Sequence, residues 1–290
     1  MYDNTTMPQG RRMAFLYDFD ETLAPGNLQE YTFIPEIHMS RTAFWQEVRK
    51  IEKASHADEI LSYMYYMLDR AKYNHRPVSR DDFLEHGRAV KFYPGVLTWF
   101  DRINAYGHKQ GVEIEHFILS CGIREMIEGT AIAHHFREIF ASSFIYDENG
   151  VACWPAQSVT YTTKTQFLTR INKGSFDVTD HTIVNKYIPE EEKYIPFTNM
   201  VYIGDGETDI PCMRLVRAGG GYSVAVYRPN SPKRRQQAVD LFNNKRADFI
   251  VPANYEDGKP VWQVAKSIID KIAAQNKIRS LQHRYNADKK

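Results

Sequence analysis

The chain has 290 residues, of which 43% are hydrophobic and 25% are charged, and its formal net charge is +1. This length allows a complete core and a second, smaller module. The near-neutral charge excludes a whole-protein attraction to nucleic acid or to an anionic membrane, so we expect neither as a partner. Three scattered cysteines argue against a disulfide framework. Since the polar N-terminus has no signal-peptide core and no apolar stretch is long enough to span a bilayer, we expect a cytoplasmic protein.

The first predicted element is a short buried strand over residues 13–17, which is followed at once by two carboxylates, Asp18 and Asp20. Turn residues come soon afterwards, at positions 25–27. In an open α/β sheet, reactive groups gather beyond the carboxyl ends of the strands. We therefore expect Asp18 and Asp20 to lie in an active-site crevice.

The next segment is helical. Apolar residues at helical spacing predict helices over residues 41–54 and 57–71, and Ser79 predicts the N-cap of a third helix that ends at residue 89. This block follows the candidate active-site loop directly and interrupts the alternation of strands and helices. We interpret it as an inserted lid, which can exclude water from the crevice.

Strands and helices alternate through the rest of the chain. The predicted helices cover residues 95–110, 161–171, 207–216 and 261–281; the predicted strands cover residues 113–119, 139–146, 151–154, 200–203, 222–227 and 248–251. An Asn-Gly pair joins the second and third of these strands and predicts a hairpin. The pattern predicts an α/β fold with a Rossmann-like, mainly parallel sheet covered by helices on both faces. The expected domains are a core of residues 1–26 and 89–290 and a helical cap of residues 27–88.

Three further segments place polar groups at strand ends or helix starts. Ser120 closes the strand before it and can hold a phosphate with the next backbone N–H groups, although an ordinary N-cap serine explains it equally simply. Lys164 stands at a predicted helix start, where the helix dipole disfavours a cation, and the alternative is a surface lysine. Asp205 and Asp209 follow the strand over residues 200–203 and can reach a hard cation, or cap a turn.

These four motifs occur in an order that resembles the haloacid dehalogenase superfamily. The similarity consists of a D-x-D-x-T loop from Asp18, a serine at Ser120, a lysine at Lys164, and a G-D-x-x-x-D pattern that contains Asp205 and Asp209. It covers residues 13–227. The helical block inserted between the first two motifs resembles the cap of the phosphoserine phosphatase-like branch.

The resemblance implies a phosphatase that hydrolyses a small phosphorylated metabolite through an aspartyl-phosphate intermediate. Asp18 would be the nucleophile. Asp20 would be the general acid and base, because a poor alkoxide leaving group needs a proton. Alternatives on the same scaffold are a phosphotransferase of the phosphomutase type and a non-catalytic binding protein.

The implied cofactor is Mg²⁺. The resemblance assigns it to the Asp18 carboxylate, the Asp20 backbone carbonyl and Asp205, with support from Asp209. Ser120 and Lys164 would hold the phosphate oxygens.

Other charged positions are harder to place from sequence. Lys173 is an alternative to Lys164, and residues 172–199 form either a surface excursion or a partner site. We interpret Arg228 and the basic run over residues 233–235 as solvated faces. The same interpretation applies to four cap residues, Glu30, Arg41, Arg70 and Lys72.

Overall fold

The structure is a computed structural model that describes residues 12–286, and this part of the chain is built on one seven-stranded sheet. The strands are β1 (Arg12–Tyr17), β2 (Glu113–Ile123), β3 (Glu138–Tyr146), β4 (Ala152–Gln157), β5 (Met200–Gly204), β6 (Tyr222–Tyr227) and β7 (Phe249–Pro252). Their order is β4-β3-β2-β1-β5-β6-β7, and every neighbouring pair is parallel except β3 and β4, which form the predicted hairpin. The predicted α/β class is confirmed.

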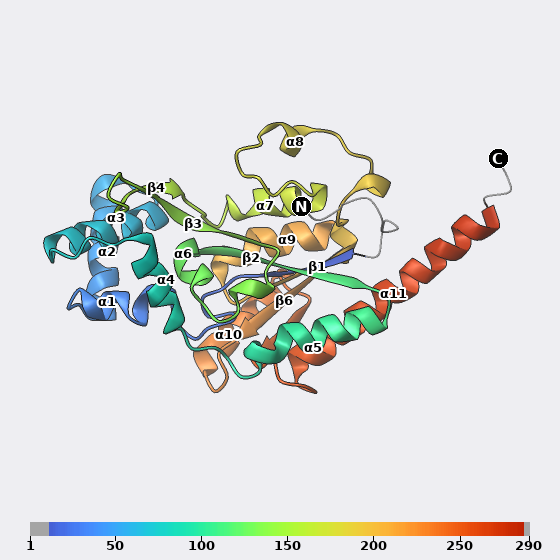
Figure 1. Ribbon diagram of the computed structural model, residues 1–290. Coiled ribbons are helices and arrows are strands. Elements are labelled where there is room, and N and C mark those ends of the chain that lie inside the picture. The colour runs from blue at the N-terminus through green and yellow to red at the C-terminus, as the bar shows by residue number, and fades with distance from the viewer. Residues whose placement is uncertain (1–11, 287–290) are drawn as a thin grey trace.

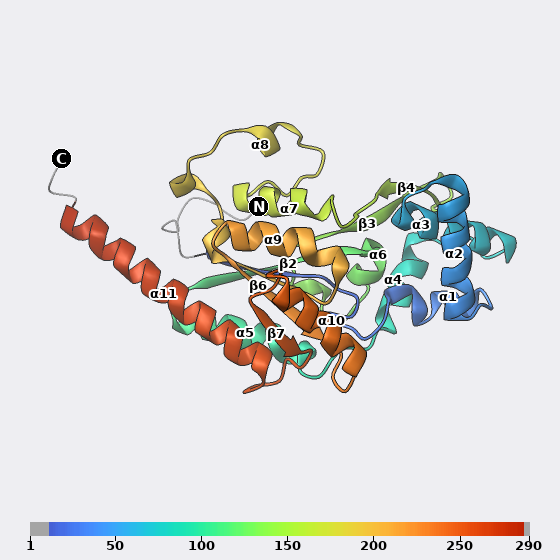
Figure 2. The same cartoon turned by 180° about the vertical axis from the view of Figure 1, so that it is seen from behind.

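Helices cover both faces of the sheet (Figures 1 and 2). Outside residues 27–88 they are α5 (Val96–Lys109), α6 (Arg124–Glu128), α7 (Lys164–Lys173), α8 (Thr182–Asn185), α9 (Ile210–Ala218), α10 (Pro232–Asn243) and α11 (Pro260–Asn286). Side chains of α5 and α11 pack with Phe15 and Tyr17 on one face of β1, and those of α7, α9 and α10 share a cluster with Ala14 and Leu16 on the other. Because both faces are buried, the strand has a continuous apolar sequence.

The helical block consists of α1 (Phe33–Glu36), α2 (Arg41–Ser55), α3 (Glu59–Tyr73) and α4 (Arg80–Arg88). These helices lie together at the end of the molecule opposite the projecting end of α11 (Figures 1 and 2). Ser79 caps α4 as predicted, since its Oγ accepts a hydrogen bond from the Asp82 backbone N–H at 3.2 Å. The division into a core and a cap at residues 27 and 88 stays a proposal.

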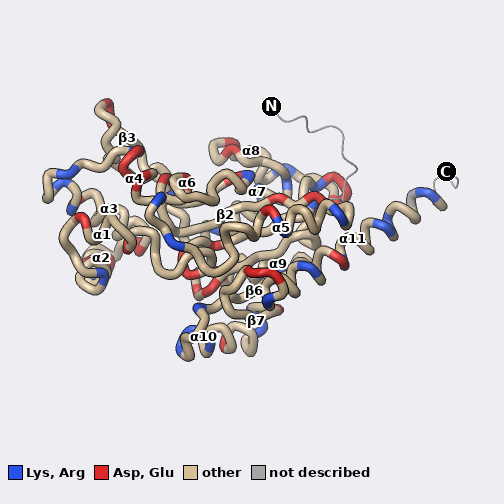
Figure 3. Tube along the Cα trace, turned by 60° about the horizontal axis from the view of Figure 1, so that its bottom comes forward, with Lys and Arg blue, Asp and Glu red and all other residues tan. Residues whose placement is uncertain are grey.

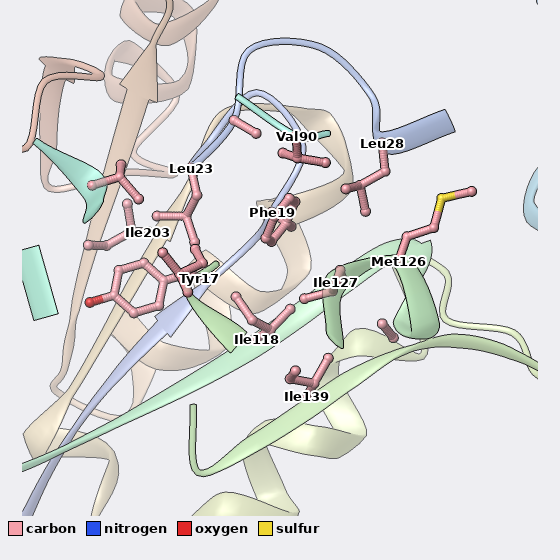
Figure 4. Packing of buried hydrophobic residues seen from close by; sticks show 14 of the residues in the cluster. Tyr17, Phe19, Leu23, Leu28, Val90, Ile118, Met126, Ile127, Ile139 and Ile203 are labelled. Atoms are coloured by element: carbon pink, nitrogen blue, oxygen red, sulfur yellow. The ribbon is translucent and has the colours of Figure 1, made fainter. Parts of the chain in front are cut away.

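The helical block does not have a hydrophobic core of its own. Its buried side chains belong to the same cluster as one face of β1, and the rings of Phe83 in α4 and Phe144 in β3 stack with centroids 5.2 Å apart. Figure 4 shows how Phe19, which lies between Asp18 and Asp20 in the first loop, and Leu28, which follows that loop, pack toward Ile127 and Met126 of α6. The loop that carries Asp18 and Asp20 therefore rests on apolar contacts that continue into the helical block.

Several element boundaries differ from the prediction. Strand β2 continues past residue 119 to Ile123, with a register shift against β3 between Leu119 and Ile123. Helix α7 begins at Lys164, because residues 161–163 form a turn, and a 3₁₀ turn over Glu207–Asp209 precedes α9. Helix α10 is not among the predicted elements, since its buried residues are Ala238 and Leu241 and its first half is polar.

Charged residues of both signs are interspersed along the trace (Figure 3), as the near-neutral composition indicates. Among the helices within residues 12–286, none combines the length and the apolar character needed to cross a membrane.

His116 in β2 is buried among aromatic rings and makes a hydrogen bond with each of its ring nitrogens. Trp99 Nε1 donates to the Tyr17 hydroxyl at 2.8 Å, so the Tyr17 proton points to His116 Nδ1 at 3.1 Å. His116 Nε2 then donates to Asn104 Oδ1 at 2.8 Å. Burial, and then the nearby His135, lower the pKa of His116 to about 3.

We expect His116 to make the free energy of unfolding fall as the solution becomes acidic. The unfolded chain takes up a proton near a pKa of about 6.5, whereas the folded chain does not, so this residue costs about 2 kcal/mol by about pH 5. The loss begins below the unfolded pKa and continues toward the folded one. Urea unfolding of the wild type and His116→Gln at about pH 7.5 and about pH 5 measures the difference. Equal pH dependence in the two proteins would contradict the assignment.

Candidate active site

The site begins where β1 ends. Asp18 follows Tyr17 directly, and its backbone N–H donates to the Ile203 carbonyl of β5 at 2.9 Å. The Asp18 side chain is buried. The pKa of Asp18 is raised to about 6. Burial raises it most, the Lys164 ammonium lowers it, and the Asp209 carboxylate adds to the rise. Asp18 is thus a shielded carboxylate at the carboxyl edge of the sheet, as predicted from sequence.

Asp20 lies two residues further along the same loop. Its Oδ1 accepts a hydrogen bond from the Leu28 backbone N–H at 3.0 Å, which closes the loop back on itself. Burial raises the pKa of Asp20 well above its ordinary value, and the nearby Asp18 carboxylate raises it further. A carboxyl group that keeps its proton more strongly than usual is suited to donate that proton to a reacting oxygen.

Lys164 joins the loops of the site by two buried ion pairs. It is the first residue of α7 and its side chain is fully buried. Its Nζ lies 3.0 Å from Asp18 Oδ1 and 2.8 Å from Asp209 Oδ1. Burial alone would lower the pKa of Lys164, but the two carboxylates raise it well above its ordinary value, so the ammonium stays charged. The structure thus favours the site lysine over the surface alternative.

Lys173, the alternative candidate, lies at the other end of α7. Its Nζ donates to the carbonyls of Ile183 at 3.2 Å and Lys186 at 2.7 Å. It therefore stabilises the segment around α8, which lies outside the sheet (Figure 1). Lys173 is not part of this site.

Asp209 is held by donors on both of its oxygens. Its Oδ1 accepts from Lys164 and from the Tyr202 hydroxyl at 2.7 Å, and its Oδ2 accepts from the backbone N–H groups of Asp205 at 3.1 Å and Gly206 at 3.3 Å. The carboxylate also lies against Gly204, where an added Cβ would be 2.3 Å from Oδ2. Asp209 therefore positions both Lys164 and the loop that carries Asp205.

Asp205 completes an acidic group with Asp18 and Asp209. Each of the three can place one carboxylate oxygen within 4.8 Å of the others. Burial raises the pKa of Asp205 well above its ordinary value, as do the Asp209 and Asp18 carboxylates. Clustered oxygen donors are the ligands that a hard divalent cation prefers. The donor set fits such an ion, with Asp18 and the more exposed Asp205 better placed than Asp209.

Ser120 lies at this edge but not at a helix start. It is a buried residue within β2, and its Oγ accepts from the Gly122 backbone N–H at 3.1 Å. Helix α6 begins at Arg124, so the expectation that Ser120 directly precedes a helix is wrong. The strand continues to Ile123 because that residue pairs with Ser142 of β3 after a register shift. Gly122 keeps space between Ser120 and Asp20, since an added Cβ would lie 3.3 Å from Ser120 Oγ and 3.4 Å from Asp20 Oδ2.

These groups open into a cleft of about 870 Å³ between the sheet edge and the helical block. The cleft is lined on one side by four of the six predicted site residues, Asp18, Asp20, Ser120 and Asp205, and on the other side by one face of α2, which carries Arg41, Trp45 and Arg49. Lys164 and Asp209 lie behind it, as their burial requires.

The interpretation of Glu30 as a solvated residue is wrong, because its side chain lines this cleft and is 10% exposed, whereas Arg41 lines the cleft with a side chain that is 60% exposed. The Glu30 carboxylate accepts from Trp45 Nε1 at 2.9 Å and from Asn27 Nδ2 at 3.1 Å, and it pairs with Arg41 at 3.3 Å. Glu30 thereby fixes the tryptophan and arginine of α2. The loop over residues 25–30 turns Glu30 inward, a tertiary effect that periodicity does not report. Arg70 and Lys72 do not line the cleft.

The sequence interpretation also missed an arginine cluster beside the first loop. Glu21, which adopts a positive φ of 55°, accepts from the Tyr93 hydroxyl at 2.9 Å and from Arg228 at 2.6 Å. Arg234 in α10 lies 3.5 Å from Glu21 and 3.7 Å from Asp205. The basic run is therefore not entirely a solvated face. A non-glycine residue at positive φ is uncommon, but φ cannot be read from sequence.

Fold and site together define an α/β protein with a lysine-neutralised acidic centre at the carboxyl edge of a parallel sheet. The family model of the haloacid dehalogenase-like hydrolases matches residues 15–214, more than half of the chain. The chain belongs to that family.

Individual proteins are similar to this chain at lower identity. A protein of Borreliella burgdorferi described as uncharacterized is 28% identical over 282 residues, which cover 86% of this chain and 94% of that protein. A phosphoserine phosphatase solved as a phospho-aspartyl intermediate analogue has a TM-score of 0.55 and 12% identity, over 89% of this chain and 99% of its own. A probable phosphoserine phosphatase from Vibrio cholerae has a TM-score of 0.56 and 12% identity, over 92% of this chain and 67% of its own. At these identities the two structures show a shared fold.

We predict that Gly204→Ala destabilises the protein and Gly206→Ala does not. The Cβ at residue 204 would occupy the place of the Asp209 carboxylate, whereas nothing lies within 4 Å of a Cβ at residue 206. Overpacking predicts a loss of about 1–3 kcal/mol in the free energy of unfolding for Gly204→Ala and less than about 1 kcal/mol for the control. Denaturant unfolding measures both. Similar losses in the two variants would show that the Asp209 contact is not the cause.

Proposed function

We propose that this protein is a Mg²⁺-dependent phosphatase that hydrolyses a small phosphate monoester through an aspartyl phosphate on Asp18. The observation that carries the proposal is the buried Lys164 ammonium between Asp18 and Asp209, with Asp205 beside them. This arrangement lets a carboxylate approach an anionic phosphate without prohibitive repulsion. Family membership supports hydrolysis. The small phosphorylated metabolite and the cytoplasmic location are predictions from sequence.

In the first half-reaction, an Asp18 carboxylate oxygen would attack phosphorus and the bond from phosphorus to the ester oxygen would break. The departing oxygen takes the proton of Asp20, whose raised pKa suits a general acid. Lys164 stays charged and compensates the negative charge of Asp18 and the transferring group. Ser120, which is buried at the same sheet edge and lines the cleft, would hold a phosphate oxygen.

In the second half-reaction, water would attack the phosphorus of the aspartyl phosphate. Asp20, now ionised, takes a proton from that water, and the bond between phosphorus and Asp18 breaks to release inorganic phosphate. Both residues return to their starting protonation states. Because the reaction proceeds by two displacements at phosphorus, the Asp20 carboxyl group acts as an acid in the first and as a base in the second.

The metal would be held by the Asp18 carboxylate, the Asp20 backbone carbonyl and Asp205, with Asp209 fixing the loop. When bound, Mg²⁺ supplies electrostatic stabilisation of the transferring phosphoryl group. Asp209 serves better as a support than as a ligand, because four donors already occupy its two oxygens.

We expect the wild type to release phosphate from p-nitrophenyl phosphate in a reaction that requires Mg²⁺ and is abolished by Asp18→Asn. The amide cannot form the covalent intermediate. Absorbance at the nitrophenolate band measures turnover with Mg²⁺ and with a chelator. Absence of Asp18-dependent turnover would overturn the proposal. Transfer of the phosphoryl group to an added acceptor, in place of phosphate release, would indicate the phosphotransferase alternative.

We expect Asp20→Asn to affect poor leaving groups most. A general acid contributes on the order of 10²- to 10⁴-fold, and an alkyl phosphate needs that proton more than a nitrophenyl phosphate does. Comparing kcat for the two ester types in wild type and variant isolates the first half-reaction. Equal losses for both esters would assign the effect of Asp20 to the second half-reaction, in which both esters share one intermediate.

A further inference from the structure

Arg234 stands between the first loop and the candidate metal-binding carboxylates. It belongs to the first turn of α10, whose Lys and Arg residues appear at one end of that helix in Figure 3. One guanidinium nitrogen lies 3.7 Å from Asp205 Oδ2 and the other lies 3.5 Å from Glu21 Oε1. Its side chain is 40% exposed, whereas those of Asp205 and Glu21 are 15% and 13% exposed. The arginine therefore reaches inward from the rim of the cleft.

Each carboxylate of the acidic group is paired with a cation. Asp18 and Asp209 share Lys164. Within residues 12–286, the ion pair found for the Asp205 side chain is the one with Arg234. Without a metal, the positive charges of Lys164 and Arg234 only partly balance the negative charges of the three carboxylates, so the group as a whole keeps a small negative charge. A bound divalent ion would make that total positive, so the guanidinium and the ion oppose each other at Asp205.

Glu21 holds Arg234 in this place. Its carboxylate already accepts from Arg228 and from the Tyr93 hydroxyl, which anchor it on two sides. An anchored carboxylate fixes the second nitrogen of Arg234 and lessens the positive potential of that arginine. Glu21 thus has two effects on Asp205: it positions the competing cation and partly neutralises it.

We propose that Arg234 is a built-in counter-cation that competes with a divalent metal ion for Asp205 and so weakens metal binding. This inference rests on the metal site of the proposed function. It assigns a role to residues of β6–α10 that lie outside the four sequence motifs. The role concerns metal affinity and requires no contact between Arg234 and the reacting atoms.

The test is Mg²⁺ binding by isothermal titration calorimetry, which needs no catalytic activity. We expect Arg234→Gln to lower the Kd for Mg²⁺ by roughly five- to tenfold, since charges in half-exposed pairs interact weakly and the ion carries two of them. Arg234→Lys keeps the charge and should stay within about twofold of wild type. Arg235→Gln is the matched control, because it removes the same charge from the next, exposed position of α10.

Glu21→Gln provides a second test, and the comparison of this single variant with the wild type stands even if Arg234→Gln does not fold. Arg234 keeps its ion pair with Asp205 when the Glu21 carboxylate is removed, and it becomes more positive, so the Kd should rise. Glu21→Gln/Arg234→Gln should then bind more tightly than Glu21→Gln. The rise in Tm on adding Mg²⁺ should follow the same order, because a ligand stabilises the folded state according to its affinity.

Equal Kd values for Arg234→Gln and Arg235→Gln would overturn the inference, as would weaker binding by Arg234→Gln or absence of Mg²⁺ binding in every variant. The expected order of Kd values without hydrolysis of p-nitrophenyl phosphate would support the inference and count against the proposed phosphatase. Hydrolysis of p-nitrophenyl phosphate, together with a Kd for Mg²⁺ that is the same in the wild type and in Arg234→Gln, would support the proposed phosphatase and overturn the inference about Arg234.

Discussion

The buried ammonium of Lys164 is the interaction on which the rest of the site depends. It lies 146 residues from Asp18 and 45 residues from Asp209 in the chain, yet it contacts both carboxylates. Two buried carboxylates this close would repel each other, and leaving a buried charge without its partner typically costs about 3–5 kcal/mol. The lysine thus makes it possible to bury acids where β1 and β5 end. Its own burial is tolerable because both partners are present.

Asp209 extends this constraint to the backbone. Its carboxylate accepts from the N–H groups of Asp205 and Gly206, and it packs against Gly204. One side chain therefore sets the turn after β5 and the position of Lys164 together. On the opposite side, the first loop rests on apolar side chains that continue into the helical block. The acids are held between a polar network and a hydrophobic support, which limits their movement before any ligand binds.

The helical block forms the second wall of the cleft, which carries arginine and tryptophan side chains opposite the acidic residues of the sheet edge. The face of α2 toward the site carries Arg41, Trp45 and Arg49 at intervals of one turn. Glu30 orders the first two through its carboxylate. Because the block shares its hydrophobic cluster with the sheet, displacement of α4 would expose the stacked rings of Phe83 and Phe144. Contacts of this kind couple the wall of the cleft to β3.

Much of the fold could be predicted because the signals are local. The apolar run of β1, the alternation of strands with helices and the cap at Ser79 each depend on neighbouring residues, and each is observed. Helix α10 could not be predicted because it buries few side chains. The end of β2 could not be predicted because pairing with β3 extends the strand past Ser120. Local pattern does not report contacts of that range.

For the site, the sequence by itself determined which residues stand where parallel strands end, since strand direction and motif order place Asp18, Asp20 and Asp205 at one edge of the sheet. Tertiary structure alone decided which charges meet: Lys164 with Asp209, Glu30 with Arg41, and Arg234 with Glu21 and Asp205. The reason is physical. Backbone hydrogen bonding and apolar periodicity act over a few residues, whereas ion pairs form between whichever side chains the packed helices bring within a few ångströms.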